Sequence, residues 1–519
     1  MNHPVCRASE NPIGGAVSAA TREATQVGEG ILAEGGNAFD AAVASAIALA
    51  VTEPGNSGLG GEGYCVFYDA QTAQTGSLCF MSVPGELAAP QNLVGKDRVR
   101  GVMASLVPSA VAGWFALISE KCSRSAEELI APAIRLAEEG YEIGGEAGAF
   151  NWMADQFHPS ARDIFVRPDR PWEPGDRLVQ TDLARTLRLI AKDGQQAFYH
   201  GEFAERMDRF YRETDGILRK RDLAAYKPLW QKTLSRSFGD VEVHVPPPES
   251  NGFAFLFGLE MLARLGYGSM SPVPAARTMV SVLGEMEQCA DNFAARLRPY
   301  DPRVDEETAR LFEDGALTDA VQRLGQEVVG CRAYRGAHTT SMSACDSSGS
   351  LVCITQTLDH GFGSGVVIPG TGVLMNDAMA WVNADPASGR ADLVAPHESQ
   401  LVPVIPTVVL SSSGKPLFAL GTPGGYGIPQ TTLQVYANIL FHKDDLQAAI
   451  DKPRVILGAL IPEEAHNRNV RLEPGFAPEV YDDLQPAKYD GFEYFGRFHA
   501  VQMTPDGDVA AFNDPREQE

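Results

Sequence analysis

YRGAHTTSMS, at Tyr334–Ser343, is the stretch from which the fold can be worked out. It begins as a loop-like run, and the alternation that follows Thr339 and Thr340 is typical of a β-strand. A turn at Cys345–Ser350 and a second strand at Leu351–Thr357 come next. Because the segments upstream have mainly helical patterns, the threonine pair marks the start of a strand-rich second part of the chain.

Helices and strands are predicted on both sides of this pair. Helical periodicity and helix caps predict helices at residues 21–33, 37–53, 107–118, 125–137, 179–193, 222–226 and 430–440, and residues 291–330 are charged and helical in pattern. Short apolar runs predict strands at residues 64–68, 77–83, 241–245 and 366–368, and another apolar run at 401–410 is broken by two prolines. This alternation favours a layered α/β or α+β architecture.

Composition limits the kinds of partner. The chain has 519 residues, of which 44% are hydrophobic, so it can bury a large core. Its 43 basic and 67 acidic residues give a net charge of −24, which repels phosphate backbones and anionic membrane surfaces. We therefore expect neither a nucleic acid nor a membrane as a partner.

The sequence also gives expectations about location and metals. The N-terminus lacks the pattern of a secretory signal, and the longest apolar candidate, Ala41–Val51, is too short to span a bilayer. We expect a soluble, cytoplasmic protein. The eight cysteines are spread singly without a CxxC pair, which indicates neither a zinc site nor a dense disulfide framework, and we expect most of them to be buried thiols.

A glycine-rich loop at Glu53–Gly63 precedes the strand at 64–68. Its spacing matches neither the Walker pattern nor the dinucleotide fingerprint, and a strand rather than a helix follows it. We therefore interpret it as a tight backbone passage against a neighbouring element, which glycine permits, rather than as a phosphate cradle.

The threonine pair has two interpretations. Thr339 and Thr340 are either ordinary strand residues, or one of them is a nucleophile. If the bond between His338 and Thr339 is cut, Thr339 gains an α-amino group with a reference pKa of about 7.7–8.0, which can act as a general base for its own hydroxyl. Acyl transfer also needs hydrogen-bond donors for an oxyanion; Gly424 and Gly425 are either such backbone donors or a plain turn.

Several stretches together resemble the γ-glutamyltransferase family of N-terminal-nucleophile hydrolases. The resemblance covers nearly the whole chain, and the joint match is more specific than any single motif. The matching stretches are GGNAFDAAVA at 35–44, Glu53–Gly63, DLAAY at 222–226, PPP at 246–248 with Gly252, Thr339-Thr340, FGSG at 362–365, Pro406-Thr407, TPGG at 422–425 and NDPR at 513–516.

The resemblance implies a fold and a set of reacting groups. The fold is an α+β, four-layer αββα sandwich, made as one precursor that cuts itself between His338 and Thr339 into a large subunit, 1–338, and a small subunit, 339–519. Thr339 is the implied nucleophile, Thr357 the second threonine that orients it, and Gly424 and Gly425 the oxyanion-hole pair. Neither a metal nor an organic cofactor is implied. We also consider a homodimer of the processed unit.

The substrate pocket departs from the pattern that the resemblance leads us to expect. Met81, Val402 and Pro403 stand where transpeptidases hold the substrate α-carboxylate with an arginine and two serines. At the positions that receive the α-amino group, Asp359, Ala378 and Trp381 are present, and only Asp359 has a suitable polar side chain. Because charge-assisted hydrogen bonds contribute about 1.5–3 kcal/mol each, this pocket should bind a glutamyl group poorly.

These departures lead to a functional expectation and its alternatives. We expect an acylase or amidase that hydrolyses a small-molecule amide with a less polar acyl group, lined by Met81, Ala378, Trp381, Val402, Pro403 and Tyr426. One alternative is hydrolysis of a small carboxylated amide or an activated C–C bond, with polar contacts from Asp359, His360 or Tyr426. The others are a γ-glutamyltransferase or glutathione hydrolase, and a non-catalytic member that is never processed.

Overall fold

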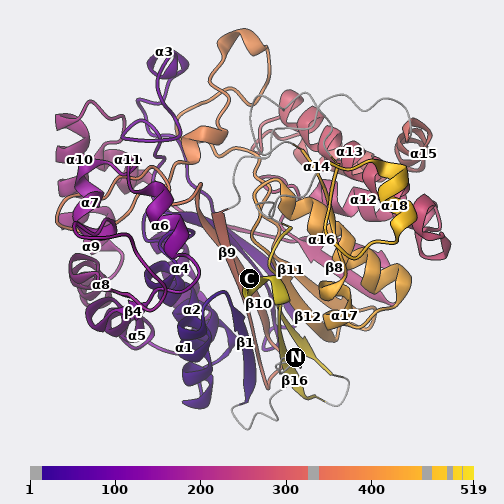
Figure 1. Ribbon diagram of the computed structural model, residues 1–519, viewed down its shortest axis with the longest axis horizontal. Helices are drawn as coiled ribbons and strands as arrows, with labels where there is room; N and C mark the ends of the chain where they lie inside the picture. The colour runs from indigo at the N-terminus through magenta and orange to yellow at the C-terminus, as the bar shows by residue number, and fades with distance from the viewer. Residues whose placement is uncertain (1–13, 325–337, 459–469, 488–494, 505–506, 519) are drawn as a thin grey trace.

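Two six-stranded antiparallel sheets lie face to face between layers of helices (Figure 1). The computed structural model describes residues 14–324, 338–458, 470–487, 495–504 and 507–518. The predicted loop-like start of the threonine stretch, Tyr334–Ala337, and the end of the helical pattern, 325–330, lie outside these residues. The four-layer αββα sandwich is confirmed.

The first sheet contains the threonine pair. Its strands are, in spatial order, β1 (Gly15–Ala19), β9 (His338–Asp346), β10 (Leu351–Asp359), β2 (Glu62–Asp69), β3 (Gln74–Phe80) and β6 (Leu229–Gln231). The second sheet has the order β16 (Val509–Asn513), β15 (His499–Met503), β12 (Pro416–Gly421), β11 (Thr407–Ser411), β8 (Val241–Val245) and β7 (Leu234–Phe238). Strands distant in sequence therefore become neighbours in both sheets.

The β9–β10 hairpin sets the register at the threonine pair. Thr339 lies directly opposite Thr357, and Thr340 lies opposite Gln356. The register shifts after Thr357, so that Asp359 pairs with His338, and Asp359 has a φ of +82°. This irregularity turns the chain at the end of the hairpin where Thr339 lies.

The first helical layer covers the first sheet. Helix α2 (Ala38–Thr52) is buried along its whole length, and the side chains of Asn37 and Asp40 form the capping box at its start. Its small residues let helix α1 (Arg22–Ala33) approach closely, since a Cβ at Gly28 would lie 2.3 Å from Ser45 Oγ. Helices α4 (Ala110–Glu120), α5 (Ala126–Glu139) and α8 (Thr181–Asp193) also belong to this core, together with α9 (Gln196–Tyr199), α10 (Glu202–Glu213) and α11 (Lys220–Ala225), and the helices predicted at 107–118, 125–137 and 179–193 are confirmed.

The second helical layer covers the outer face of the second sheet. It shares one apolar core with that sheet and contains α12 (Gly252–Arg264), α13 (Pro272–Arg296), α14 (Val304–Leu311), α15 (Asp314–Arg323), α16 (Gly427–Ala437), α17 (Leu446–Asp451) and α18 (Pro478–Leu484). Figure 1 shows this layer on the opposite side of the strands from α1 and α2.

A third apolar core lies between the two sheets. Alternate residues of strands in both sheets supply it, including Cys345, Cys353, Val408, Ala419 and Val501. Because side chains alternate along a strand, the odd-numbered residues of β9 point toward the second sheet. Thr339 therefore faces the space between the sheets, whereas Thr340 faces the first helical layer.

Two details differ from the predicted elements. The strand predicted at 366–368 is wrong: Val367 forms only an isolated bridge with Leu374, because a turn reverses the chain at once. In the apolar run at 401–410, the strand begins only at Thr407, after the second proline. Of the part of the chain that the structure covers, no helix has the length and apolar character needed to cross a bilayer.

Candidate active site

The hydroxyl of Thr357 is the centre of a short chain of hydrogen bonds at the start of β9. Thr339 Oγ1 donates to Thr357 Oγ1 over 3.1 Å, and Thr357 Oγ1 donates to the carbonyl oxygen of His338 over 2.7 Å. The backbone N–H of Asp359 also donates to Thr357 Oγ1, at 2.8 Å. One hydroxyl thus contacts both the candidate nucleophile and the carbonyl of the bond that precedes it.

Thr340 lies in a different environment. Its partner across the strands, Gln356, accepts a hydrogen bond from the indole of Trp114 at 3.0 Å and donates to the carbonyl of Ala46 at 2.8 Å. Both contacts belong to the first helical layer. Geometry therefore places Thr339, and not Thr340, beside Thr357.

Strand β12 carries the glycine pair to the same end of the sandwich as Thr339. The beginning of β12 lies at the β9–β10 turn, where a Cβ at Gly349 would be 3.4 Å from Pro416. Its end lies against the start of β9, since a Cβ at Gly421 would be 2.1 Å from Ser341 Oγ. Because β12 runs in the opposite direction to β9, its continuation to Gly424 extends toward Thr339.

The backbone of the glycine pair forms a tight turn. Gly424 and Gly425 have φ angles of +147° and +52°, which favour glycine. Their carbonyls accept hydrogen bonds from the amides of Gly427 and Ile428, at 2.8 and 3.0 Å. Neither glycine amide donates to another residue that the structure describes.

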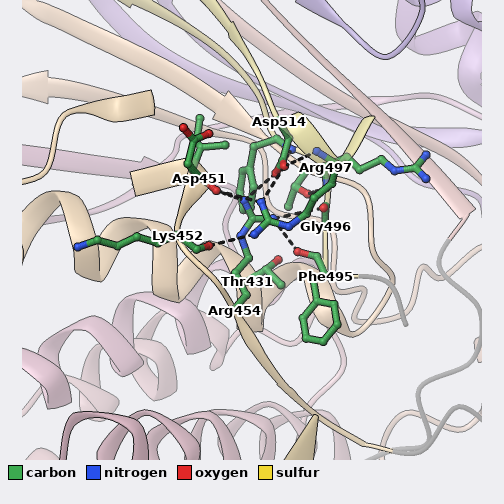
Figure 2. A network of polar contacts seen from close by, with 12 residues as sticks. Thr431, Asp451, Lys452, Arg454, Phe495, Gly496, Arg497 and Asp514 are labelled. Carbon is green, nitrogen blue, oxygen red and sulfur yellow. Dashed lines mark hydrogen bonds and ion pairs between the residues drawn. The ribbon is translucent and has the colours of Figure 1, made fainter. Parts of the chain in front are cut away.

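A buried arginine, Arg454, lies at the centre of a network of polar contacts (Figure 2). Arg454 is 1% exposed, pairs with Asp514 at 2.6 Å and donates to the carbonyls of Phe495 and Gly496 at 2.7 and 3.2 Å. The next amide along, that of Arg497, donates to Thr422 Oγ1 at 2.9 Å. The C-terminal NDPR motif thus helps to fix the residues that begin the loop.

Two acidic side chains lie beside Thr339 and Thr357. Glu62 and Asp359 are buried next to one another, and Ser82 N–H donates to Glu62 at 2.7 Å. Burial raises the pKa of Glu62 to about 7. Burial also raises the pKa of Asp359 well above its usual value, and the neighbouring Glu62 and Asp377 carboxylates add to the rise. Each of these two carboxyls therefore makes ionisation of the other less favourable.

Asp377, by contrast, has basic partners. It accepts hydrogen bonds from the His360 backbone at 2.9 Å and from His360 Nδ1 at 2.7 Å, and Arg100 lies 3.7 Å away. The imidazole of His360 stacks on the indole of Trp381 at 5.2 Å between ring centroids. The edge of Trp381 in turn meets Tyr426, also at 5.2 Å, so an aromatic wall joins His360 to the glycine loop.

Comparison with known proteins decides the family. The family described as Gamma-glutamyltranspeptidase matches residues 24–519. The chain belongs to this family.

Relatives within the γ-glutamyltranspeptidase family include hydrolases and acylases. The chain is 29% identical over 544 residues to a glutathione hydrolase proenzyme of Escherichia coli, with 99% of this chain and 91% of the relative covered. It is 31% identical over 474 residues to the acylase ACY 1 proenzyme of a Pseudomonas species, with 85% and 82% covered. The crystal structure of cephalosporin acylase from Bacillus halodurans superimposes with a TM-score of 0.87 at 25% identity, covering 97% of this chain and 94% of that one.

These findings confirm the family resemblance and support an amidohydrolase or acylase of the γ-glutamyltranspeptidase family. Relatives described as proenzymes also suggest a precursor that is divided into subunits.

The apolar and aromatic side chains predicted to line the substrate pocket lie in three places. Met81 and Val402 pack in one apolar cluster with Tyr64, Cys79 and Val404, and Pro403 next to them is buried. Trp381 and Tyr426 form the aromatic wall. Ala378 does not share either cluster: it packs with Leu106, Met379 and Val382, although it directly follows Asp377.

Sequence reasoning missed two carboxyls of this site. Glu62 is the one charged residue inside the glycine-rich stretch 58–63, and a lone carboxyl in such a stretch could have indicated a site residue. Asp377 gave no comparable signal, since its contact with His360 forms only in the folded chain. In the described ranges, no group of three or more His, Cys, Asp or Glu residues could hold a metal ion.

Proposed function

We propose that this member of the γ-glutamyltranspeptidase family is a self-processing threonine-nucleophile amidohydrolase whose acyl group is less polar than a γ-glutamyl group. The observation that carries the proposal is the hydrogen-bond chain from Thr339 through Thr357 to the His338 carbonyl.

Self-cleavage would begin with attack of Thr339 Oγ1 on the carbonyl carbon of His338. The C–N bond between the two residues breaks, its nitrogen gains the hydroxyl proton and becomes the α-amino group of Thr339, and an ester forms. Water then hydrolyses the ester, which leaves a carboxylate on His338 and restores the hydroxyl. Thr357 donates to the carbonyl oxygen on which negative charge develops.

Turnover of a substrate would use the same atoms. The α-amino group of Thr339 takes the proton from the neighbouring hydroxyl, whose oxygen attacks the substrate amide carbon. The free amides of Gly424 and Gly425 stabilise the oxyanion, the amine leaves with the proton, and water releases the acyl group. Asp359 N–H holds Thr357 in place throughout.

The environment of the nucleophile supports a less polar acyl group. Met81, Val402 and Pro403 offer no charge to a carboxylate, and Glu62 and Asp359 bring additional acidic groups close to the threonines. An acyl group with its own carboxylate would therefore enter an acidic environment without a counter-ion from these positions. This argues against a small carboxylated acyl group. For a γ-glutamyl group it argues against binding of the α-carboxylate, whereas Asp359 remains a suitable acceptor for the α-amino group.

A matched set of anilides tests the substrate class. The γ-glutamyl, glutaryl and hexanoyl amides of one aniline release the same product, so their kcat/KM values compare acyl groups alone. We expect kcat/KM for the hexanoyl anilide to be at least tenfold higher than for the γ-glutamyl and glutaryl anilides. One charge-assisted hydrogen bond that the site fails to make to a carboxylate, about 1.5–3 kcal/mol, corresponds to a factor of roughly 10 to 150 in kcat/KM. Faster turnover of the γ-glutamyl anilide would refute the proposed acyl specificity. The Thr339→Ala variant serves as the background.

A further inference from the structure

His338, the residue before the proposed cleavage bond, has its side chain held in a fixed slot. Its Nδ1 lies 3.1 Å from Asn56 Oδ1, on the glycine-rich loop after α2. Gly361 closes the other side, since a Cβ there would lie 3.0 Å from the Cε1 and Nε2 atoms of the ring. The imidazole thus fits between two loops, and a side chain at 361 would crowd the ring.

Asn56 is itself oriented by its neighbours. Its side-chain amide donates to Glu53 at the end of α2, and its backbone carbonyl accepts from the amide of Leu358 at 3.0 Å. Because the NH₂ group is used by Glu53, the oxygen of Asn56 points to His338 and requires a proton on Nδ1 of that ring. Burial lowers the pKa of His338 to about 4, and the nearby His360 and Arg100 add to the effect, so the ring is neutral at pH 7.

The backbone of His338 is held as well. Its carbonyl oxygen accepts the 2.7 Å hydrogen bond from Thr357, and the residue pairs with Asp359 across the strands. Side chain and carbonyl are therefore fixed by two different segments, the 53–56 loop and the end of β10. Rotation of the peptide between residues 338 and 339 would break one of these contacts.

We infer that Asn56 and His338 are positioning residues for self-cleavage: their side-chain hydrogen bond holds the His338 carbonyl carbon in place for Thr339 Oγ1. The inference rests on the proposed function. Through Asn56, the glycine-rich loop would have a second role besides close packing, which is to position the bond that is cut. It also separates cleavage from later turnover, because His338 is no longer joined to the nucleophile once the bond is cut.

Substitutions on both partners test this inference. Asn56→Leu removes the acceptor at nearly constant size, and His338→Phe removes the donor but keeps a ring. His338→Asn restores a donor near the position of Nδ1 and is the conservative variant. Exposed Asn92 on helix α3 (Pro90–Leu93), changed to leucine, is the matched control.

The measurement follows the full chain after a pulse of cell-free synthesis, as the fraction converted into two fragments with time. We expect Asn56→Leu and His338→Phe to slow conversion about tenfold, near the upper range for one buried hydrogen bond, and His338→Asn and the control to stay within about threefold. Turnover per cleaved molecule should fall by a smaller factor than the cleavage rate, and the unfolding temperature is measured alongside.

The outcomes separate this inference from the proposed function. Wild-type protein that stays uncut while hydrolysing amides would overturn both. Wild-type cleavage with unchanged rates in Asn56→Leu and His338→Phe would overturn the positioning role alone. If Asn56→Leu does not fold, the two His338 variants decide: slower cleavage in the phenylalanine variant supports the role, and equal rates overturn it.

Discussion

Replacing Thr357 with valine tests how the hydrogen-bond chain acts. Valine keeps the shape and strand preference of threonine but removes the hydroxyl. That hydroxyl accepts from Thr339 and from Asp359 N–H and donates to the His338 carbonyl, over 3.1, 2.8 and 2.7 Å. The variant therefore loses three contacts without a change in volume.

The expected effects differ for stability and for rate. The buried Asp359 N–H is left without its acceptor, which should lower the free energy of unfolding by about 1–3 kcal/mol. If the hydroxyl stabilises the oxyanion on the His338 carbonyl, its loss should slow cleavage by about 10²–10³. A purely structural hydroxyl would not slow cleavage to that extent.

Thr355→Val is the matched control for this prediction. Thr355 is buried two residues earlier on the same face of β10, and its hydroxyl lies 3.1 Å from Ser341 Oγ. Both variants are compared by pulse synthesis and by urea unfolding. We expect the control to slow cleavage less than threefold. Cleavage of Thr357→Val at the rate of the Thr355→Val control would refute the reasoning.

Three further predictions concern the loop, the acidic group and the buried arginine. Gly424→Ala places a side chain at a φ of +147°, which strains the backbone and moves its N–H away from the oxyanion, so kcat of the processed enzyme should fall by about 10² or more. Since burial raises the pKa of Glu62 to about 7, the folded state holds this proton more tightly than the unfolded state, and the free energy of unfolding should fall as pH rises from about 4.5 to 7; Glu62→Gln should flatten that fall in urea titrations at pH 5 and 8. Arg454→Met removes one of the two arginines that pair with buried Asp514, since Arg516 stays 2.8 Å away, and should cost about 1.5–3 kcal/mol in chemical unfolding.

Each of these predictions has a control at an exposed position. Gly414→Ala, at a positive φ in the β11–β12 turn, should leave kcat unchanged. Glu120→Gln should leave the pH dependence of stability as it is, and Arg212→Met should cost less than about 1 kcal/mol. Equal effects in a variant and its control would contradict the corresponding prediction.

Local patterns predicted much of the framework. The capping residues of α2 and α5 and the strand alternation after Thr339 are encoded within a few residues, so the elements they specify could be read from the sequence. The glycine-rich loop was also interpreted correctly as a close passage: a Cβ at Gly60 would lie 2.0 Å from the carbonyl of Leu374. The segment 366–368 misled us because an apolar tripeptide does not reveal the turn that ends its pairing.

The site was harder to predict, because its contacts join segments far apart in the chain. Nothing near His360 indicates that it stacks on Trp381 and binds Asp377, since both contacts depend on how the loops after β10 fold together. Likewise, the position of Ala378 in an apolar cluster of its own follows from packing, not from its place beside a polar residue. The sequence supplied the candidate reacting residues; only the fold shows which side chains surround them.

The intact mass of the purified protein tests most directly whether the chain cuts itself between His338 and Thr339. We expect two fragments, residues 1–338 and 339–519, whose masses place the cut before Thr339, and a single uncut chain without amidase activity in Thr339→Ala. A fully active wild-type protein that remains one chain of 519 residues, or fragments that meet at another bond, would contradict it.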